Sequence, residues 1–189
     1  MLEKIIQLDK QLFVFLNGLG SEQFDGLWLL ITKQLHWAPF FVFIFYLLYK
    51  KVGWKHLLLI LISIAALITF SDQFTNLIKN NVQRLRPCND LEIKDIIRIV
   101  KASDTFSYFS GHASNSMAST TFVFLILRKY YKYAFLLFLF PLIFAYSRIY
   151  LGLHFPGDIL SGYVFGAFAG CGFSKLYDIF RKKYFPESL

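Results

Sequence analysis

The chain has 189 residues, of which 56% are hydrophobic and 20% aromatic, while only 17% are charged. An ordinary soluble domain carries about 25% charged residues, and a globule of this length does not easily bury 23 phenylalanines. This composition and the mean hydropathy of +0.49 exclude a disordered protein, a disulfide scaffold and a soluble enzyme. They predict one membrane-embedded domain over residues 1–189.

The net charge is +8 at neutral pH. On a soluble protein this charge would suggest nucleic acid as a partner. Here the basic residues cluster at the ends of apolar runs, which is typical of membrane topology. We therefore expect the lipid bilayer as the partner, and no nucleic acid. Cys171 lies inside an apolar run and Cys88 has no partner near it in the sequence, so that neither predicts a disulfide or a zinc site.

Residues 3–17 are too short and too charged to span a bilayer, which takes about 20 apolar residues. Their apolar side chains fall roughly on one helical face, and most charged side chains lie elsewhere. This pattern predicts a helix within residues 1–20 that lies in the membrane interface. An amphipathic helix packed on the rest of the protein fits the pattern equally well.

Residues 26–180 hold the apolar segments expected to cross the membrane. The first contains Lys33, His36 and Pro39, which predict a kinked or partly inserted outer half and mark a disrupted helix rather than the mouth of a site. The fold class is therefore an all-α, polytopic membrane bundle of about five transmembrane helices plus the interfacial helix. The expected spans are residues 26–49, 54–78, 112–127, 133–148 and 157–180.

The basic residues predict how these spans are oriented. The segments after the first, third and fifth spans must share one side of the membrane. They hold ten of the 20 basic residues and two of the 12 acidic residues. The positive-inside rule makes this side cytoplasmic, so the N-terminus and a loop over residues 79–111 face outward.

Polar residues that a membrane anchor does not need gather on the outer side. They lie in residues 79–87, 110–112 and 147–158. Lys79, Arg86 and Arg148 are fixed cations, and arginine offers a planar fork of donors suited to phosphate oxygens. Ser110 and Gly111 stand where a helix is expected to begin, with free backbone N–H groups and the positive end of the helix dipole. These features predict a phosphate-binding site.

His112, His154 and Asp158 add groups suited to catalysis. The histidines supply a proton donor and a nucleophile, and Asp158 can accept an N–H from the ring of His154. Taken singly, a membrane histidine more often packs or forms a hydrogen bond, and Asp158 also fits a helix cap. Ionisable groups that meet at one membrane face are costly, however, and tend to be functional.

Together these residues form a known pattern: Lys79, six residues, Arg86-Pro87; Ser110-Gly111-His112; Ser147-Arg148, five residues, His154, three residues, Asp158. It resembles the tripartite signature of the type 2 phosphatidic acid phosphatase family, which shares a helical fold with vanadium haloperoxidases. The resemblance spans residues 79–158. The chain departs from the family at Phe109, where a proline is usual, and the loss of proline is expected to loosen this turn.

The resemblance implies a role for each matched residue. His154 takes the phosphoryl group, Asp158 orients His154, and His112 protonates the leaving oxygen. The substrate phosphate is then held by Lys79, Arg86, Ser110, Gly111 and Arg148. Phosphoryl transfer needs mainly positioning and charge stabilisation, and the sequence has no Asp/Glu/His cluster with metal spacing. We therefore expect no metal and no cofactor.

The predicted function is hydrolysis of a phosphomonoester or diphosphate of a membrane lipid through a phosphohistidine, in a bacterial inner membrane with the site toward the periplasm or exterior. Candidate substrates are undecaprenyl diphosphate, a lipid A phosphate, phosphatidylglycerol phosphate and phosphatidic acid, with the first two favoured because the site faces outward. Two alternatives are a lipid-phosphate binding or transport protein and a vanadate-dependent peroxidase. Binding alone needs no nucleophile, and a small membrane-embedded chain argues against the peroxidase.

Other polar residues have two interpretations each. Asp72, Asn76 and Lys79 recur on one helical face, where Asp72 either steers a site cation or forms an interhelical hydrogen bond. Lys94, Arg98 and Lys101 fit a solvated loop face better than a headgroup site. Hydroxyl residues of the third span predict close helix packing: Ser114, Ser116, Ser119, Thr120 and Thr121.

Overall fold

The computed structural model describes residues 1–185, and within that range it contains helices and loops but no strand. The predicted all-α class is therefore confirmed. The α-helices are α1 (Leu2–Gly18), α2 (Asp25–Ile31), α3 (Ala38–Val82), α4 (Gly111–Leu127), α5 (Leu139–Tyr150) and α6 (Pro156–Tyr184).

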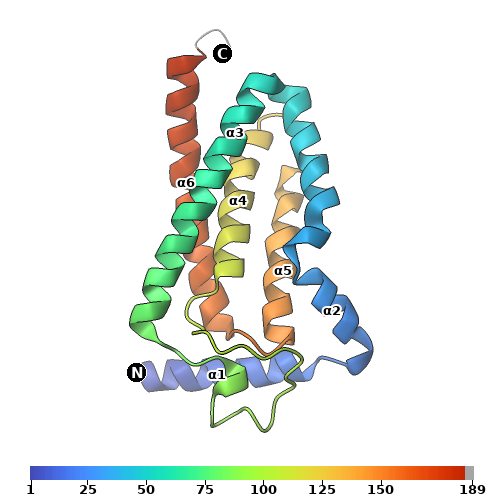
Figure 1. The fold of residues 1–189 in the computed structure, drawn as a ribbon, viewed down its shortest axis with the longest axis vertical. Coiled ribbons are helices and arrows are strands. Elements are labelled where there is room, and N and C mark those ends of the chain that lie inside the picture. Colours follow the sequence, from blue (N-terminus) through green and yellow to red (C-terminus); the bar gives the residue numbers. More distant parts are fainter. Residues whose placement is uncertain (186–189) are drawn as a thin grey trace.

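The long helices form an antiparallel bundle, and α1 lies crosswise at one end of it (Figure 1). Helix α3 contributes two arms, which run along the bundle in opposite directions. The end beside α1 also carries the α3–α4 loop and the α5–α6 link, and we call it the site end. The opposite end carries the turn of α3 and the C-terminal end of α6, and we call it the basic end.

The two arms of α3 meet at Gly53, whose φ of 74° and ψ of 176° lie outside the helical region. Glycine takes this backbone conformation without the clash that a Cβ would cause. The residues predicted as two separate spans therefore form one sharply bent element. Within residues 1–185, two stretches are long and apolar enough to cross a membrane: Gln34–Asn89 and Pro156–Tyr184.

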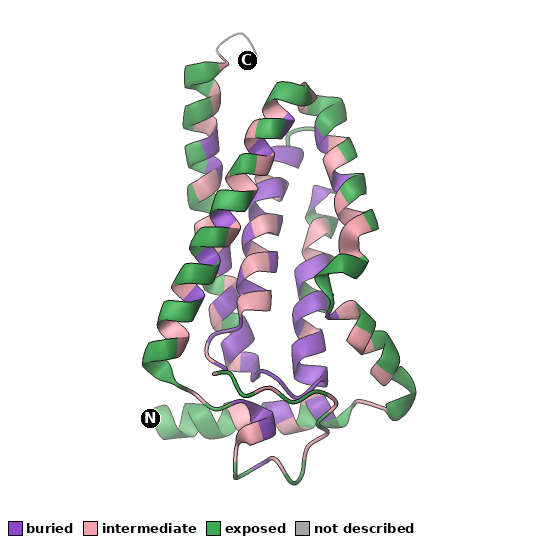
Figure 2. Ribbon diagram, viewed as in Figure 1, coloured by how far each residue is buried: buried purple, intermediate pink, exposed green. Residues whose placement is uncertain are grey.

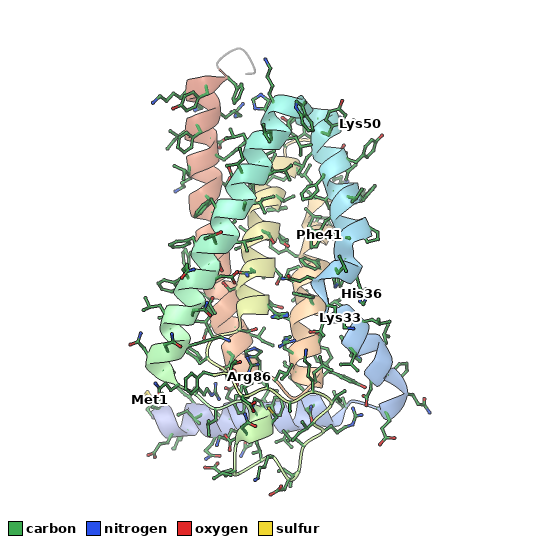
Figure 3. The ribbon with its side chains drawn as sticks, viewed as in Figure 1. Met1, Lys33, His36, Phe41, Lys50 and Arg86 are labelled. Atoms are coloured by element: carbon green, nitrogen blue, oxygen red, sulfur yellow. The ribbon has the colours of Figure 1, made fainter. Side chains whose placement is uncertain are left out.

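The segment before α3 is broken, as its polar residues predict. Helix α2 ends at Ile31, the 3-10 helix η2 covers Gln34–Trp37, and α3 begins at Ala38. The side chains of His36 and Trp37 each lie 2.8 Å from a backbone carbonyl oxygen at the end of α2, that of Leu30 or Ile31. These carbonyls lie at the end of α2, where the regular helical hydrogen bonds stop, so Lys33 and His36 do mark a disrupted helix (Figure 3).

Several predicted boundaries need correction. Residues 79–82 are helical, because α3 continues to Val82 and ends at Gln83, which has a left-handed φ of 50°. The loop therefore covers residues 83–110 and includes the 3-10 helix η3 (Pro87–Asn89). The predicted span at residues 133–148 begins with the 3-10 helix η4 (Ala134–Phe138) before α5.

Helix α1 packs on the bundle, as one of the two interpretations of its pattern predicts. Phe13 and Asn17 are fully buried against the rest of the protein, and Asn17 donates hydrogen bonds to the backbone oxygens of Ile149 and Tyr150 at 3.1 Å. Leu8 and Leu12, in contrast, remain exposed. The helix is thus packed on the bundle, while part of its apolar surface is exposed.

Helices α4 and α6 form the most extensive helix–helix interface of the bundle. Gly162, Gly166 and Gly170 recur every fourth residue along α6, and a Cβ at any of them would clash with a backbone oxygen of α4. Small residues on both helices let the backbones approach closely. The hydroxyl-rich α4 was predicted to pack closely, but its glycine counterpart in α6 was missed.

This interface gives a stability prediction. Gly166→Leu forces a large side chain against Ser114 and Ala118 and is expected to lower the free energy of unfolding by about 2–3 kcal/mol, since overpacking a close interface costs that much. Gly172→Leu is the matched control, because nothing lies within 4 Å of a Cβ placed there. Thermal unfolding in detergent compares the two variants, and equal stabilities would contradict the close packing.

The buried residues are concentrated toward the site end of the bundle (Figure 2). The outer faces of α3 and the C-terminal part of α6 are mostly exposed, whereas α4, α5 and the start of α6 are largely buried near the site end. The most deeply buried polar side chains of the described residues include His154 and Asp158. Ionisable groups are thus enclosed at one end of an apolar bundle, where their burial is energetically costly.

Candidate active site

The structure brings the three predicted polar segments together at the site end. Arg86 lies in the loop after α3, next to α1 (Figure 3). His112 opens α4, and His154 lies in the link between Tyr150, where α5 ends, and Pro156, where α6 begins. Side chains from the three segments, which lie between residues 79 and 158 of the sequence, therefore come together in one small volume.

His154 is the central side chain, with 1% of its surface exposed. Its Nε2 lies 3.1 Å from an Nη of Arg86, and its Nδ1 lies 3.5 Å from Oδ2 of Asp158. Burial lowers the pKa of His154 to about 3, although Asp158 acts in the opposite direction. The imidazole is therefore neutral at neutral pH and keeps a lone pair on one nitrogen, as a nucleophile requires.

Asp158 is fully buried in the first turn of α6 and has two roles. Its Oδ2 accepts the backbone N–H of Phe155 at 2.9 Å, which caps the helix, and it also accepts the hydroxyl of Ser107. The same hydroxyl lies 3.3 Å from Nδ1 of His154. Asp158 therefore caps α6, and the same carboxylate lies beside the His154 ring, with Ser107 next to the pair.

Arg86 is held rigidly by oxygen acceptors of the loops around it. It donates to the backbone oxygen of Thr105 at 2.8 Å, to the Thr105 hydroxyl at 2.8 Å and to the backbone oxygen of Leu153 at 2.9 Å. None of these acceptors is a carboxylate, so the positive charge of Arg86 is oriented but not neutralised.

The other two predicted cations are also without a carboxylate. Arg148 is buried and donates to the Thr32 hydroxyl at 2.7 Å, while its Nε is buried without a partner among residues 1–185. Lys79 donates to the backbone oxygen of Phe106 at 3.2 Å. Neither forms an ion pair in this part of the chain. A buried arginine donor without a partner is costly, and an anion would satisfy it.

The Ser110-Gly111-His112 segment forms the start of α4. The Ser110 hydroxyl accepts the backbone N–H of Ala113 at 3.4 Å as the helix cap, and it still has its own proton to donate. Gly111 has only the Thr75 methyl group near the position of a Cβ, at 3.5 Å. His112 stacks on Phe144 with ring centroids 5.1 Å apart.

Phe109, which stands where the resembling family has proline, is anchored by packing. It is buried and lies against Phe165, with ring centroids 5.4 Å apart, and against Phe74 at 6.2 Å. The turn before Ser110 is therefore held by an aromatic cluster that joins α3 and α6.

The sequence analysis missed an ion network behind the site. Arg84 donates to Asp158 at 2.8 Å and to Asp9 of α1 at 2.7 Å, and its guanidinium lies 3.9 Å from the centre of the Phe155 ring. Asp9 also accepts the backbone N–H of Gly157 at 2.7 Å. Arg84 falls inside the Lys79–Arg86 motif, so the sequence could have indicated it. Nothing in the sequence near Asp9 points to residue 157.

Arg84 is thus expected to position Asp158. We expect Arg84→Gln to lower kcat by about 10- to 100-fold with little change in KM, because a displacement of about 1 Å at a reacting group costs on the order of 100-fold. Arg128→Gln, an exposed arginine at the basic end, is the control. Steady-state phosphate release measures both, and a kcat equal to that of the parent would remove Arg84 from the account.

The remaining polar candidates have structural partners. Asp72 accepts a hydrogen bond from the Asn115 amide at 2.7 Å, which is the interhelical interpretation. Arg98 pairs with Asp25 at 2.9 Å and lies over the Tyr150 ring, so it ties the loop to the protein and is not a free loop cation. Lys94 and Lys101 lie on the same loop, at half-buried and exposed positions.

Comparison with known proteins identifies related sequences. The model of the PAP2 superfamily matches residues 56–182. A lipid A 4'-phosphatase of Bacteroides thetaiotaomicron is 36% identical over 174 residues, which cover 90% of this chain and 77% of the relative. A lipid A 4'-phosphatase of Porphyromonas gingivalis is 28% identical, with 99% of this chain and 80% of the relative covered.

Two solved structures share the fold. A transmembrane PAP2-type phosphatidylglycerolphosphate phosphatase from Bacillus subtilis superposes with a TM-score of 0.68 at 19% identity, covering 96% of this chain and 88% of the other. Aquifex aeolicus LpxE superposes with a TM-score of 0.58 at 22% identity, covering 87% and 93%. The family model covers well over half of the sequence, and the signature residues meet at one end of the bundle. The chain belongs to the PAP2 superfamily.

Proposed function

We propose that this phosphatase removes the 4'-phosphate of lipid A, and that it does so through a phosphohistidine on His154. The observation that carries the phosphatase chemistry is the set of three cations, Lys79, Arg86 and Arg148, none paired with a carboxylate among residues 1–185, around a buried neutral imidazole. The choice of lipid rests on the two relatives, whose printed function is lipid A 4'-phosphatase.

An anion is the ligand that this electrostatic setting requires. Each arginine is held by hydrogen bonds to neutral oxygens, so the positive charge is in place before substrate arrives. Preorganised charge of this kind stabilises the negative oxygens of a phosphoryl group in the transition state without reorganisation of the protein. A soluble anion and a lipid headgroup share this chemistry, and the apolar surroundings favour the lipid.

The position of each nitrogen of His154 suggests its role. Nδ1 faces Ser107 and Asp158, so a proton on Nδ1 is held there and Nε2 carries the lone pair beside Arg86. Attack of Nε2 on phosphorus forms a P–N bond and breaks the P–O bond to the lipid. The imidazole then carries a positive charge, which the Asp158 carboxylate stabilises.

His112 is placed to complete the reaction. The departing lipid oxygen takes a proton from His112, and water then attacks the phosphohistidine, giving its proton to His112 as phosphate leaves. Both steps balance with one proton carried by one imidazole. The stacking of His112 on Phe144 fixes the plane of the ring.

The membrane arrangement follows from the same charges. We propose five spans, given by the two arms of α3, α4, α5 and α6, with the basic end in the cytoplasm and the site end facing outward from a bacterial inner membrane. Helix α1 lies in the outer interface. The apolar tail of the substrate stays in the bilayer while its headgroup meets the helix ends.

Phosphate release in the presence of EDTA tests this function. We expect the detergent-purified protein to release phosphate from lipid A and to keep at least 80% of its rate, roughly, when chelator is added, because the three cations supply the charge that a metal would supply. Undecaprenyl diphosphate, phosphatidylglycerol phosphate and phosphatidic acid complete the panel. Loss of the rate with EDTA would contradict the mechanism, and a faster rate with another lipid would correct the substrate.

A further inference from the structure

A groove opens on the side of the bundle, between the two arms of α3 and helices α4 and α5. Its volume is about 310 Å³ and its wall is mostly apolar. Phe41 reaches from the first arm of α3 toward α5, where its ring lies 5.3 Å from that of Phe140 (Figure 3). Nothing described above uses this groove.

The groove leads to the candidate active site. Phe144 lines it and also stacks on His112 at 5.1 Å. Ser116 lines it as well, and its hydroxyl donates to the backbone oxygen of His112 at 2.6 Å. A lipid whose phosphate reaches His112 and His154 therefore has this groove as a path for one of its chains.

Polar side chains interrupt the apolar wall at Gln34, Ser116, Ser119 and Thr120, and at one hydrogen-bonded pair. Asp72 of α3 and Asn115 of α4 both line the groove, and the Asn115 amide donates to Oδ1 of Asp72 at 2.7 Å. Oδ2 of Asp72 has no partner among residues 1–185, and Oδ1 of Asn115 is buried without one. Both remaining atoms are hydrogen-bond acceptors.

Asp72 lies in the second arm of α3, a segment proposed above to cross the membrane, and its side chain is exposed at the groove. An ionisable side chain that faces the bilayer is costly and calls for a partner. The Asn115 amide supplies one donor, and the structure leaves room for another from a ligand.

We propose that the groove binds one acyl chain of the substrate, and that Asp72 and Asn115 accept a hydrogen bond from a hydroxyl or amide N–H group carried by that lipid near its phosphate. The inference rests on the proposed function and narrows its substrate class. A lipid with plain ester-linked chains, or a polyprenyl chain, offers no donor and leaves the carboxylate unsatisfied. Sites built to bind a polar group discriminate against ligands that lack it.

Two commercial lipids, which carry the same charged headgroup, test this selectivity as probes. Ceramide 1-phosphate carries a hydroxyl and an amide N–H near its phosphomonoester, whereas phosphatidic acid of matched chain length carries neither. We expect the parent protein to have a kcat/KM about tenfold higher for ceramide 1-phosphate, which is the size of one hydrogen bond to a charged group. Lipid A serves as the reference substrate.

Variants assign the selectivity to the groove. In Asp72→Leu the ratio of the two kcat/KM values is expected to fall close to one. Asn76→Leu is the matched control, since Asn76 lies one turn further along α3, is exposed and does not line the groove. If Asp72→Leu does not fold, Asp72→Asn removes the charge at constant shape and is expected to lower the ratio as well.

The outcomes separate this inference from the proposed function. A parent that releases phosphate from both probes equally, or from lipid A and neither probe, overturns the role of Asp72 and leaves the phosphatase intact. A ratio unchanged in both Asp72 variants overturns it too. No release from lipid A or from either probe overturns the proposed function itself.

Discussion

His154→Ala is expected to abolish phosphate release, with a loss in kcat on the order of 10⁴-fold. The proposed reaction begins with a bond between Nε2 of His154 and phosphorus, and no other described side chain is placed to make that bond. Removal of a nucleophile from a catalytic group that acts as a unit costs on this order or more. Phosphate release from lipid A, followed at saturating substrate, measures the loss.

Two comparisons keep this result interpretable. His154 is buried, so its truncation leaves a cavity, and His154→Gln fills most of that space without a nucleophile. His36→Ala removes an exposed histidine outside the site and is expected to keep the parent rate. A His154 variant that folds and still turns over within tenfold or so of the parent would show that the chemistry uses another nucleophile.

His112→Gln is expected to lower kcat on lipid A by about 10²- to 10⁴-fold, the usual contribution of a general acid. In the first step, measured as the burst of nitrophenolate from p-nitrophenyl phosphate, the same variant should lose far less, because nitrophenolate leaves without a proton. The attack of water that follows uses His112 with either substrate. The ratio of the two losses separates proton donation from simple binding.

The control for His112 is Phe144→Leu, which removes the stacked ring but keeps the imidazole. It is expected to lower both activities by a similar and smaller factor, since it affects the position of His112 and not its proton. Equal losses of His112→Gln in the first step on the two substrates would contradict the role of His112 as the acid.

Much of this site could be predicted from the sequence because its residues are chemically distinctive and lie in three short segments. The spacing from Lys79 to Arg86-Pro87 and from Arg148 to Asp158 is enough to identify the candidate site residues. The broken helix around His36 was also predictable, since a charged residue and a proline both disfavour a continuous apolar helix there.

The rest depended on contacts between distant parts of the chain. Asp9 meets the backbone of Gly157 across 148 residues of sequence, and Ser107 meets Asp158 across 51. Neither residue stands in a pattern that sets it apart from its neighbours. Gly53 was also missed, because a positive φ joins two spans into one bent element and leaves no trace in hydropathy.

The glycines of α6 are a different case. Gly162, Gly166 and Gly170 follow a spacing of four that is typical of close helix packing in membranes. The sequence therefore contains a signal for this interface that the hydroxyl residues of α4 alone do not give. The structure shows that α6 contributes the smaller side chains to the interface, namely its glycines.

The central claim is that the phosphoryl group passes through His154, and trapping that intermediate tests it most directly. Lipid A labelled with ³²P in its 4'-phosphate is mixed with the parent protein and quenched in alkali, which preserves a P–N bond that acid destroys. The account predicts an alkali-stable, acid-labile label that maps to the peptide containing His154 and is absent in His154→Gln. Full turnover with no label on the protein, or a label on another residue, would contradict it.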